Sequence, residues 1–194
     1  MTLECIHEYD GEVWYQSDFL LKNKAQLFDS LLDKIAWQQE SYRMFGRDVW
    51  SPRLLAWYGD EQAVYTYSGK VHEPLPWMPD LLELRNKLQD TLNCPFNAVL
   101  LNLYRDGRDY MGWHADNEPE LGQQPVIASL SLGAERLFRI QHKKSKVKKE
   151  WTLADGSLLV MRGELQSCWR HSIPKQLRVS EPRINLTFRQ VYPR

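Results

Sequence analysis

Residues 183–189 are Arg-Ile-Asn-Leu-Thr-Phe-Arg, a strict alternation of polar and apolar side chains. Because successive side chains of a strand point to opposite faces, this period predicts a β-strand with one polar and one apolar face. The polar face carries Arg183, Asn185, Thr187 and Arg189. Two arginines inside a β-fold are costly unless anions pair with them, and a dicarboxylate held at each end would satisfy both. An edge strand with a solvated polar face is the alternative.

The chain before this strand, from about Phe96 onward, also has the pattern of short strands. Gly133-Ala-Glu135 and Ala154-Asp-Gly156 separate strand candidates in the manner of hairpin turns. Several short strands with regular turns predict a mostly β fold with α, in which residues 96–194 form a double-stranded β-helix, or jelly roll. The strand candidates are Asn97–Tyr104, 124–132, 136–141, 151–153, 157–161 and 183–191.

Residues 1–95 are expected to add helices that pack outside this core. An apolar stripe with a period of 3.6 predicts a helix over Ser17–Trp37, with Ser17 as its cap. A second helix is expected to begin near Pro79 and to run through Leu92. Residues 42–77 are rich in aromatics, Gly and Pro, which favours short strands and loops.

The composition favours one domain, residues 1–194, that we expect to be monomeric and intracellular. No run of about 18 apolar residues predicts a membrane span, and the N-terminus lacks the pattern of a signal peptide. Cys5, Cys94 and Cys168 are odd in number and form no CxxC motif, which favours free thiols in a reducing compartment. That compartment would be the cytoplasm of a bacterium or the nucleus of a eukaryote.

The net charge of zero hides an asymmetry along the chain. Residues 1–135 hold 11 Lys and Arg against 21 Asp and Glu, which gives −10, whereas residues 136–194 hold 14 against 4, which gives +10. The densest basic run is His142–Lys149. Such a run is either a solvated loop or a patch that contacts phosphates.

Three further residues form a candidate metal site. His114 and Asp116 share a face if their segment is extended, and His171 would have to come from a distant strand. Two imidazoles and one carboxylate can hold one face of a ferrous ion and leave positions open for a co-substrate and O₂. Asn102 and Tyr104 also share a strand face, where an amide and a phenol suit the oxygens of a small acid. The alternative for Tyr104 is ordinary core packing.

Together these residues resemble the AlkB family of Fe(II)- and 2-oxoglutarate-dependent dioxygenases, which repair alkylated nucleobases. The similarity covers roughly residues 43–192 and is closer to the branch typified by the animal nuclear enzymes than to the founding bacterial enzyme. Segments 45–46, 52–53, 57–59 and 65–69 carry that closer similarity. The family motifs are Asn102-x-Tyr104, His114-x-Asp116, His171-x-x-Pro174 and Arg183-x-Asn185-x-Thr187-x-Arg189.

The resemblance implies a role for each of these positions. His114, Asp116 and His171 would be the iron ligands. Arg183 would bind the distal carboxylate of 2-oxoglutarate and Arg189 would approach the carboxylate beside the keto group. The remaining pocket residues would be Asn102, Tyr104, Asn185 and Thr187. Decarboxylation of 2-oxoglutarate to succinate would be coupled to hydroxylation of an N-methyl group, which then leaves as formaldehyde.

The resemblance also implies a nucleic-acid substrate, whose target base must be flipped out of a duplex or lie in a single strand. Tyr65 and Tyr67 would line the base pocket, and Glu118 would read the base edge or the positive charge of 1-methyladenine or 3-methylcytosine. Phe45 is either a finger that fills the gap left by the base or an exposed turn aromatic. Arg53 and the basic run would contact phosphates.

The sequence leaves several alternatives open. The substrate is either DNA or RNA, single- or double-stranded, and the sequence does not rank the possible alkyl lesions. A 2-oxoglutarate dioxygenase that acts on a protein or a small molecule would use the same iron and co-substrate residues. A jelly-roll binding module without enzymatic activity is a third possibility.

Overall fold

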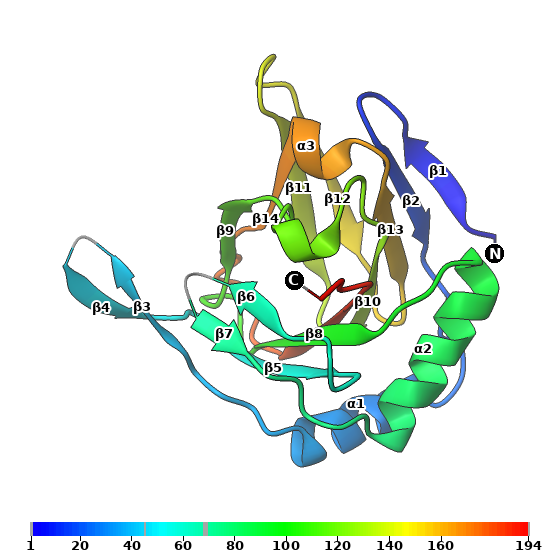
Figure 1. Cartoon of the computed structure of the whole chain (residues 1–194), viewed down its shortest axis with the longest axis vertical. Helices are drawn as coiled ribbons and strands as arrows, with labels where there is room; N and C mark the ends of the chain where they lie inside the picture. Colours follow the sequence, from blue (N-terminus) through cyan, green and yellow to red (C-terminus); the bar gives the residue numbers. More distant parts are fainter. Residues whose placement is uncertain (1, 45, 68–69, 194) are drawn as a thin grey trace.

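A computed structural model describes residues 2–44, 46–67 and 70–193 as two antiparallel sheets that face each other (Figure 1). The large sheet has the order β1-β2-β13-β10-β15-β8-β5 and the small sheet the order β12-β11-β14-β9. The large sheet consists of β1 (Glu4–His7), β2 (Glu12–Gln16), β5 (Leu54–Gly59), β8 (Ala98–Tyr104), β10 (Ile127–Gly133), β13 (Leu158–Arg162) and β15 (Arg183–Arg189). The small sheet consists of β9 (Met111–His114), β11 (Arg136–His142), β12 (Lys148–Leu153) and β14 (Trp169–Ile173).

This arrangement confirms the predicted jelly roll. Two further hairpins project beside the sheets (Figure 1), and they fall in the segment for which short strands were expected. They are β3 (Ser41–Met44) with β4 (Arg47–Trp50), and β6 (Tyr65–Tyr67) with β7 (Lys70–His72). Three strands of the large sheet, β1, β2 and β5, come from residues 1–95, so the sheet is not built from the C-terminal half alone.

The predicted strand at 183–189 is β15, which lies in the middle of the large sheet. It pairs with β10 on one side and with β8 on the other, and every residue of the strand is buried. This central position excludes the alternative of an edge strand with a solvated face. Both faces of β15 are therefore removed from water.

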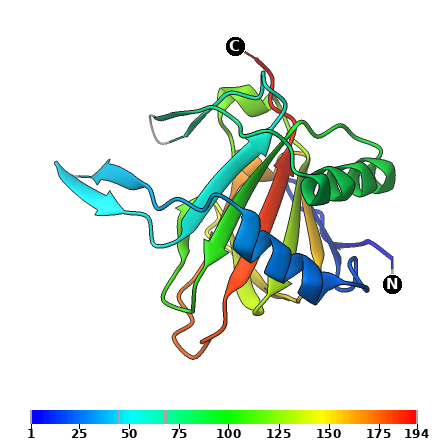
Figure 2. The ribbon, with the colours of Figure 1, turned by 90° about the horizontal axis from the view of Figure 1, so that it is seen from below.

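The apolar face of β15 is covered by the two long helices, α1 (Lys24–Lys34) and α2 (Pro79–Leu92). Figure 2 shows both helices against the same side of the large sheet. Leu31 of α1 and Leu84 of α2 are buried in one cluster with Phe188 of β15. As expected, α2 begins at Pro79, whose missing N–H needs no partner in the first turn. No helix among the described residues is long and apolar enough to cross a membrane.

The expected start of the first helix is wrong. Helix α1 begins after Asn23, which adopts a left-handed conformation with φ 59°. The preceding segment instead crosses the end of the sheet, where the N–H of Leu20 donates to the carbonyl of Gly156 at 2.9 Å. Phe19 and Leu20 are buried by this route, so the apolar stripe that predicted a longer helix reflects tertiary packing of a non-helical segment.

The prediction of hairpins at residues 133–135 and 154–156 is also wrong. The strands on either side of these turns exist, but they do not pair with each other. Strand β10 lies in the large sheet and β11 in the small one, while β12 and β13 are likewise divided between the sheets. Turn residues reverse the chain, but they do not determine which sheet receives the next strand. The basic run forms a true hairpin instead, because β11 and β12 pair directly on either side of residues 143–147.

Candidate active site

Three potential metal ligands meet between the two sheets. His114 ends β9 and lies opposite His171 of β14 in the sheet register, and Asp116 follows two residues after His114. The imidazole centroids are 4.1 Å apart, and Nε2 of His114 lies 3.6 Å from Oδ1 of Asp116. One ligand atom from each residue lies within 4.8 Å of the others. The three side chains are thus close enough to coordinate a single metal ion.

The electrostatics keep these groups in their ligand forms. Burial would raise the pKa of Asp116, but Arg189 and the two imidazoles outweigh it and lower that pKa to about 2. Nη2 of Arg189 donates to Oδ2 of Asp116 at 3.1 Å. Burial, with the nearby His114 next, lowers the pKa of His171 to about 3. At neutral pH the cluster therefore offers a carboxylate and an unprotonated imidazole, the forms that bind metals.

Gln166 holds the backbone of the acidic ligand, a contact that the sequence did not reveal. It lies on the short helix α3 (Leu165–Cys168), is 2% exposed, and its Oε1 accepts the N–H of Asp116 at 2.9 Å. Nζ of Lys143 in turn donates to the backbone carbonyl of Gln166 at 2.9 Å. A single glutamine 50 residues away in sequence forms no motif with Asp116, so only the fold could identify it.

The other end of the pocket is cationic. Arg183 is 1% exposed and lies 5.2 Å from the ring of Tyr104, and its Nη2 donates to Oγ of Ser131 at 2.9 Å. Its Nε and Nη1 have no hydrogen-bond partner within the described ranges. Burial lowers the pKa of Arg183 to about 10, so the group stays charged at neutral pH.

A second buried arginine shows how this chain satisfies a structural guanidinium. Arg136 is also 1% exposed and lies 5.4 Å from the same Tyr104 ring. Its nitrogens donate to the backbone carbonyls of Asp106, Asp109 and Pro174 at 2.8–3.2 Å. Arg136 is thus satisfied by backbone carbonyls, whereas two nitrogens of Arg183 have no partner among the described residues. The Arg183 end of the pocket therefore fits an external anion such as a carboxylate.

The remaining predicted pocket residues also line this pocket, but they bond to one another. Nε of Arg53 donates to Oδ1 of Asn102 at 2.6 Å. Nδ2 of Asn185 donates to Oγ of Ser129 at 2.7 Å, and the hydroxyl of Thr187 donates to Oδ1 of Asn185 at 3.1 Å. These bonds link polar side chains that line the pocket. Arg53 is 4% exposed, so it lies inside the pocket rather than on the surface where a phosphate contact was expected.

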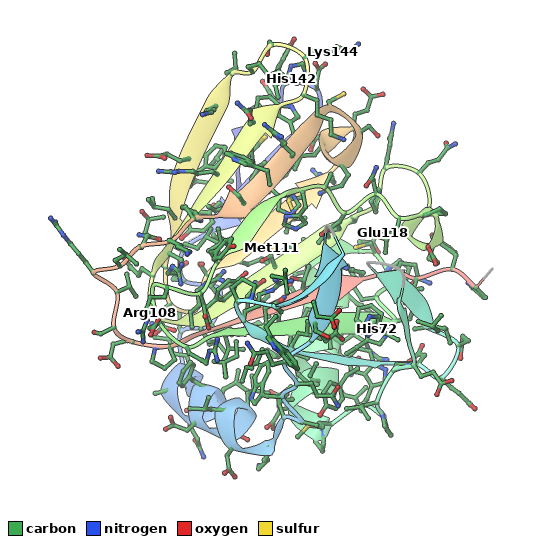
Figure 3. All side chains as sticks on the ribbon, turned by 90° about the vertical axis from the view of Figure 1, so that its left-hand side faces the viewer. His72, Arg108, Met111, Glu118, His142 and Lys144 are labelled. Carbon is green, nitrogen blue, oxygen red and sulfur yellow. The ribbon has the colours of Figure 1, made fainter. Side chains whose placement is uncertain are left out.

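The predicted substrate residues are only partly described. Phe45 lies outside the described residues, and so do the side chains of Tyr65 and Tyr67, although β6 forms where a strand was expected. Glu118 does not line the pocket around the metal ligands. It is half-buried, and its Oε2 has no hydrogen-bond partner among the residues that the structure describes. Figure 3 shows Glu118 and His72 on the same side of the molecule.

The basic run is partly used inside the molecule. Besides the contact of Lys143 with Gln166, Nζ of Lys146 donates to the carbonyl of Lys143, and Nζ of Lys149 lies 3.1 Å from Nδ1 of His7. Lys144 is exposed at the tip of the β11–β12 hairpin (Figure 3). Only part of the run is thus available to contact phosphates.

Comparisons with known proteins agree with this geometry. The family model described as the 2OG-Fe(II) oxygenase superfamily matches residues 13–189. Alpha-ketoglutarate-dependent dioxygenase alkB homolog 3 of Bos taurus is 41% identical over 183 residues, which cover 89% of this chain and 63% of that protein. DNA oxidative demethylase ALKBH2 of Mus musculus is 39% identical over 181 residues, covering 89% of this chain and 73% of that protein.

The chain spans about 63% of the length of the bovine and human alkB homolog 3 proteins. A solved structure described as the structure of OsALKBH1 superimposes with a TM-score of 0.67 and covers 97% of this chain and 99% of its own. Its sequence identity is 14%, so this likeness supports the fold alone.

Proposed function

Because this chain belongs to the AlkB family of the 2OG-Fe(II) oxygenase superfamily, we propose that it demethylates N-alkylated bases in DNA. It would do so as an Fe(II)- and 2-oxoglutarate-dependent dioxygenase. The observation that carries the proposal is that one pocket contains both the metal-ligand cluster and the incompletely bonded guanidinium of Arg183. We also infer that residues 1–194 act as one monomeric dioxygenase domain in an intracellular, reducing compartment.

His114, Asp116 and His171 would hold the Fe(II) ion. When bound, iron would activate O₂ for decarboxylation of 2-oxoglutarate and for hydroxylation of the N-methyl group. Three protein ligands leave open positions for the co-substrate and for O₂. Arg189 orients Asp116 through its 3.1 Å bond, and Gln166 fixes the same residue through its backbone N–H. Hydroxylation would convert the N-methyl group into a hydroxymethyl group, which would leave the base nitrogen as formaldehyde.

Arg183 would bind the distal carboxylate of 2-oxoglutarate through its Nε–H and Nη1–H groups, which have no partner in the described part of the chain. Arg189 would lie beside the carboxylate next to the keto group, because it already contacts Asp116. Expulsion of water from this pocket would strengthen both interactions. The pocket would be completed by Asn102, Tyr104, Asn185 and Thr187.

A methylated base is the substrate class that these observations favour. The mouse relative is named a DNA oxidative demethylase. Oε2 of Glu118, which has no hydrogen-bond partner among the described residues, suits 1-methyladenine and 3-methylcytosine, since both bases are cationic. Tyr65 and Tyr67 would line the pocket for the flipped base, and Phe45 would fill the gap that the base leaves. These three roles stay predictions from the sequence. RNA is a second possible nucleic acid.

The proposal can be tested with a panel of oligonucleotides that carry 1-methyladenine or 3-methylcytosine, in single and double strands of DNA and RNA. With Fe(II), 2-oxoglutarate and O₂, the protein should form succinate and formaldehyde and restore the unmodified base. Asp116→Ala should abolish turnover, because the ion loses its only carboxylate ligand. Exposed Glu61→Ala is the matched control and should keep full activity.

Two results would contradict the proposal in different ways. Full activity of a folded Asp116→Ala protein would refute the metal assignment. Formation of succinate without repair of any methylated oligonucleotide would instead favour the alternative of a protein or small-molecule substrate.

A further inference from the structure

A second group of possible metal ligands lies outside the pocket, where three distant segments meet. Asp10 lies in the turn between β1 and β2, His142 ends β11, and Cys168 ends α3. One ligand atom from each lies within 4.8 Å of the others. We propose that Asp10, His142 and Cys168, with Glu164 beside them, form a second site that binds a structural zinc ion.

The distances suit three ligands to one ion, and Glu164 lies beside the sulfur as a candidate fourth ligand. Oδ2 of Asp10 lies 3.1 Å from Nε2 of His142, and Sγ of Cys168 lies 3.9 Å from Oε2 of Glu164. Tetrahedral zinc, with bonds of about 2.0–2.3 Å, separates its ligand atoms by roughly 3.3–3.8 Å. Small side-chain rotations would therefore bring the donors to coordination distance. A thiolate, an imidazole and carboxylates are donors that zinc accepts in proteins.

The charges around the sulfur favour a cation. The carboxylates of Asp10 and Glu164 lie beside the Cys168 thiol, so the group gathers negative charge that a divalent ion would offset. Zinc would replace the thiol proton, which passes to solvent, and would neutralise the adjacent carboxylates.

The surroundings of His142 hold its ring in place for coordination through Nε2. The ring lies 5.0 Å from that of Trp169 and 5.7 Å from that of Tyr9, and its side chain is only 6% exposed. Nδ1 lies 2.8 Å from Oγ of Ser145. A zinc-bound histidine commonly donates its other N–H to an oxygen, and this hydroxyl can accept that proton.

The backbone N–H of Ser145 also faces Nδ1, at an N···N distance of 3.0 Å, and Nε2 faces Oδ2 of Asp10 at 3.1 Å. Coordination of zinc through Nε2 would require the ring proton on Nδ1, where the hydroxyl of Ser145 can accept it.

The proposed site would join the N-terminal hairpin to the element that supports the active site. Figure 3 shows His142 beside Lys144 at the end of the β11–β12 hairpin, far from Arg108. Helix α3 carries both Cys168 and Gln166, whose side chain holds the backbone of Asp116. Zinc would therefore fix α3 in the position that Asp116 requires.

Co²⁺ can test the site in the metal-free full-length protein, because its spectrum distinguishes the two ligand sets. Only a site with a thiolate gives intense sulfur-to-cobalt charge-transfer absorption in the near ultraviolet, and the cluster of His114, Asp116 and His171 has no sulfur. The wild-type protein should bind two equivalents of Co²⁺ and show the band, which Zn²⁺ should then abolish. Cys168→Ser should bind one equivalent without the band.

Matched variants separate this site from other thiols and from the active site. Cys5→Ser and Cys94→Ser, which alter the other two cysteines, should keep the band. His171→Ala should lose one equivalent of Co²⁺ but also keep the band. Asp10→Asn, an exposed position, should weaken Co²⁺ binding at the thiolate site by at least about 10-fold, which provides a test even if Cys168→Ser does not fold.

The proposal would be overturned if wild-type protein at saturating Co²⁺ showed no charge-transfer band, or if the band persisted in folded Cys168→Ser. Unchanged Co²⁺ affinity in Asp10→Asn would also overturn it. These spectra do not depend on demethylase activity, so failure of this inference and failure of the proposed function are distinguishable.

Discussion

The apolar face of β15 packs against two helices, whereas its polar face meets the small sheet across a pocket. Ile184, Leu186 and Phe188 on the first face are 0% exposed, and Arg183 and Arg189 on the second are 1% and 4% exposed. Both faces are thus buried. The difference is that hydrophobic packing completes the first within the chain, while the second keeps guanidinium N–H groups at Arg183 without a partner among the described residues.

This difference shows how a functional face can be recognised in a fully buried strand. Exposure alone does not distinguish the two faces, because both lie in the interior. The hydrogen bonds of the buried guanidinium groups do distinguish them, because a buried charge without partners is costly and an external anion would offset that cost. The predictions below test whether the apolar face supplies stability and the polar face supplies ligand binding.

The largest expected effect is on the apolar face. Phe188→Ala should lower the free energy of unfolding by about 3–5 kcal/mol, because it leaves a cavity between the sheet and the helices. Chemical denaturation of the metal-free protein measures this loss. Leu21→Ala, at a side chain that is 71% exposed, should change stability by less than about 0.5 kcal/mol. Equal effects of the two variants would contradict the assignment of the apolar face to stability.

On the polar face, Arg183→Met should weaken 2-oxoglutarate binding by about 10- to 100-fold, because one carboxylate loses its charge-assisted partner. The free energy of unfolding without the co-substrate should not fall, since a buried charge with unmet donors is removed. Calorimetric titration with 2-oxoglutarate and denaturation together measure both quantities.

Arg136→Met is the matched control for Arg183, because both guanidinium groups lie beside Tyr104. It should destabilise the protein, since three backbone carbonyls lose their donors. An unchanged 2-oxoglutarate isotherm in Arg183→Met would refute the proposed role of the polar face.

A smaller effect is expected next to the pocket, at Gln166. Gln166→Leu removes the acceptor of the Asp116 N–H, and metal affinity should fall by about 10-fold while the fold is retained. Titration with Mn²⁺ in the presence of 2-oxoglutarate measures this change. Gln123→Leu, at an exposed position, should leave metal affinity unchanged. If Gln166→Leu behaved like this control, Gln166 would have no role in positioning Asp116.

The smallest effect is the pH dependence of the metal-free protein. His171 has its pKa lowered by burial to about 3, so between that pH and about 6.5 the unfolded chain binds a proton that the folded chain does not. Stability should therefore fall as the pH is lowered through 6.5, by less than about 1 kcal/mol between pH 7 and pH 6. Chemical denaturation at each pH should show that the free energy of unfolding depends less steeply on pH in His171→Leu than in the wild-type protein. The same pH dependence in both proteins would contradict the neutral, buried state of His171.

Much of the fold was predictable because its signals are local. The alternation at 183–189 predicted β15, and Pro79 predicted the start of α2. The longer first helix was wrong because Phe19 and Leu20 are buried by a non-helical segment that packs on the turn at Gly156. The two hairpins were wrong because turn residues do not record which sheet receives the next strand.

For the candidate site, the predictable residues were those in short motifs. His114 and Asp116 are two residues apart, and Arg183 begins a strand with a clear period. Gln166 and the zinc ligands proposed around Cys168 were not predictable, because each is a single residue brought to its partners from far along the chain. Arg53 was expected to contact phosphates, yet it lines the pocket and is 4% exposed.

The sequence by itself determined that this protein has a β-strand whose polar face carries two arginines, and it predicted which side chains could offer donors to a metal or a dicarboxylate. These properties follow from residue chemistry and from the period of two, which need only neighbouring residues. The tertiary structure alone decided that β15 is central, that Arg136 is satisfied while Arg183 is not, and that α3 lies behind Asp116. The physical reason is that a hydrogen bond between residues 50 positions apart, such as Asp116 and Gln166, forms only when the sheets have packed. That packing is a property of the whole chain.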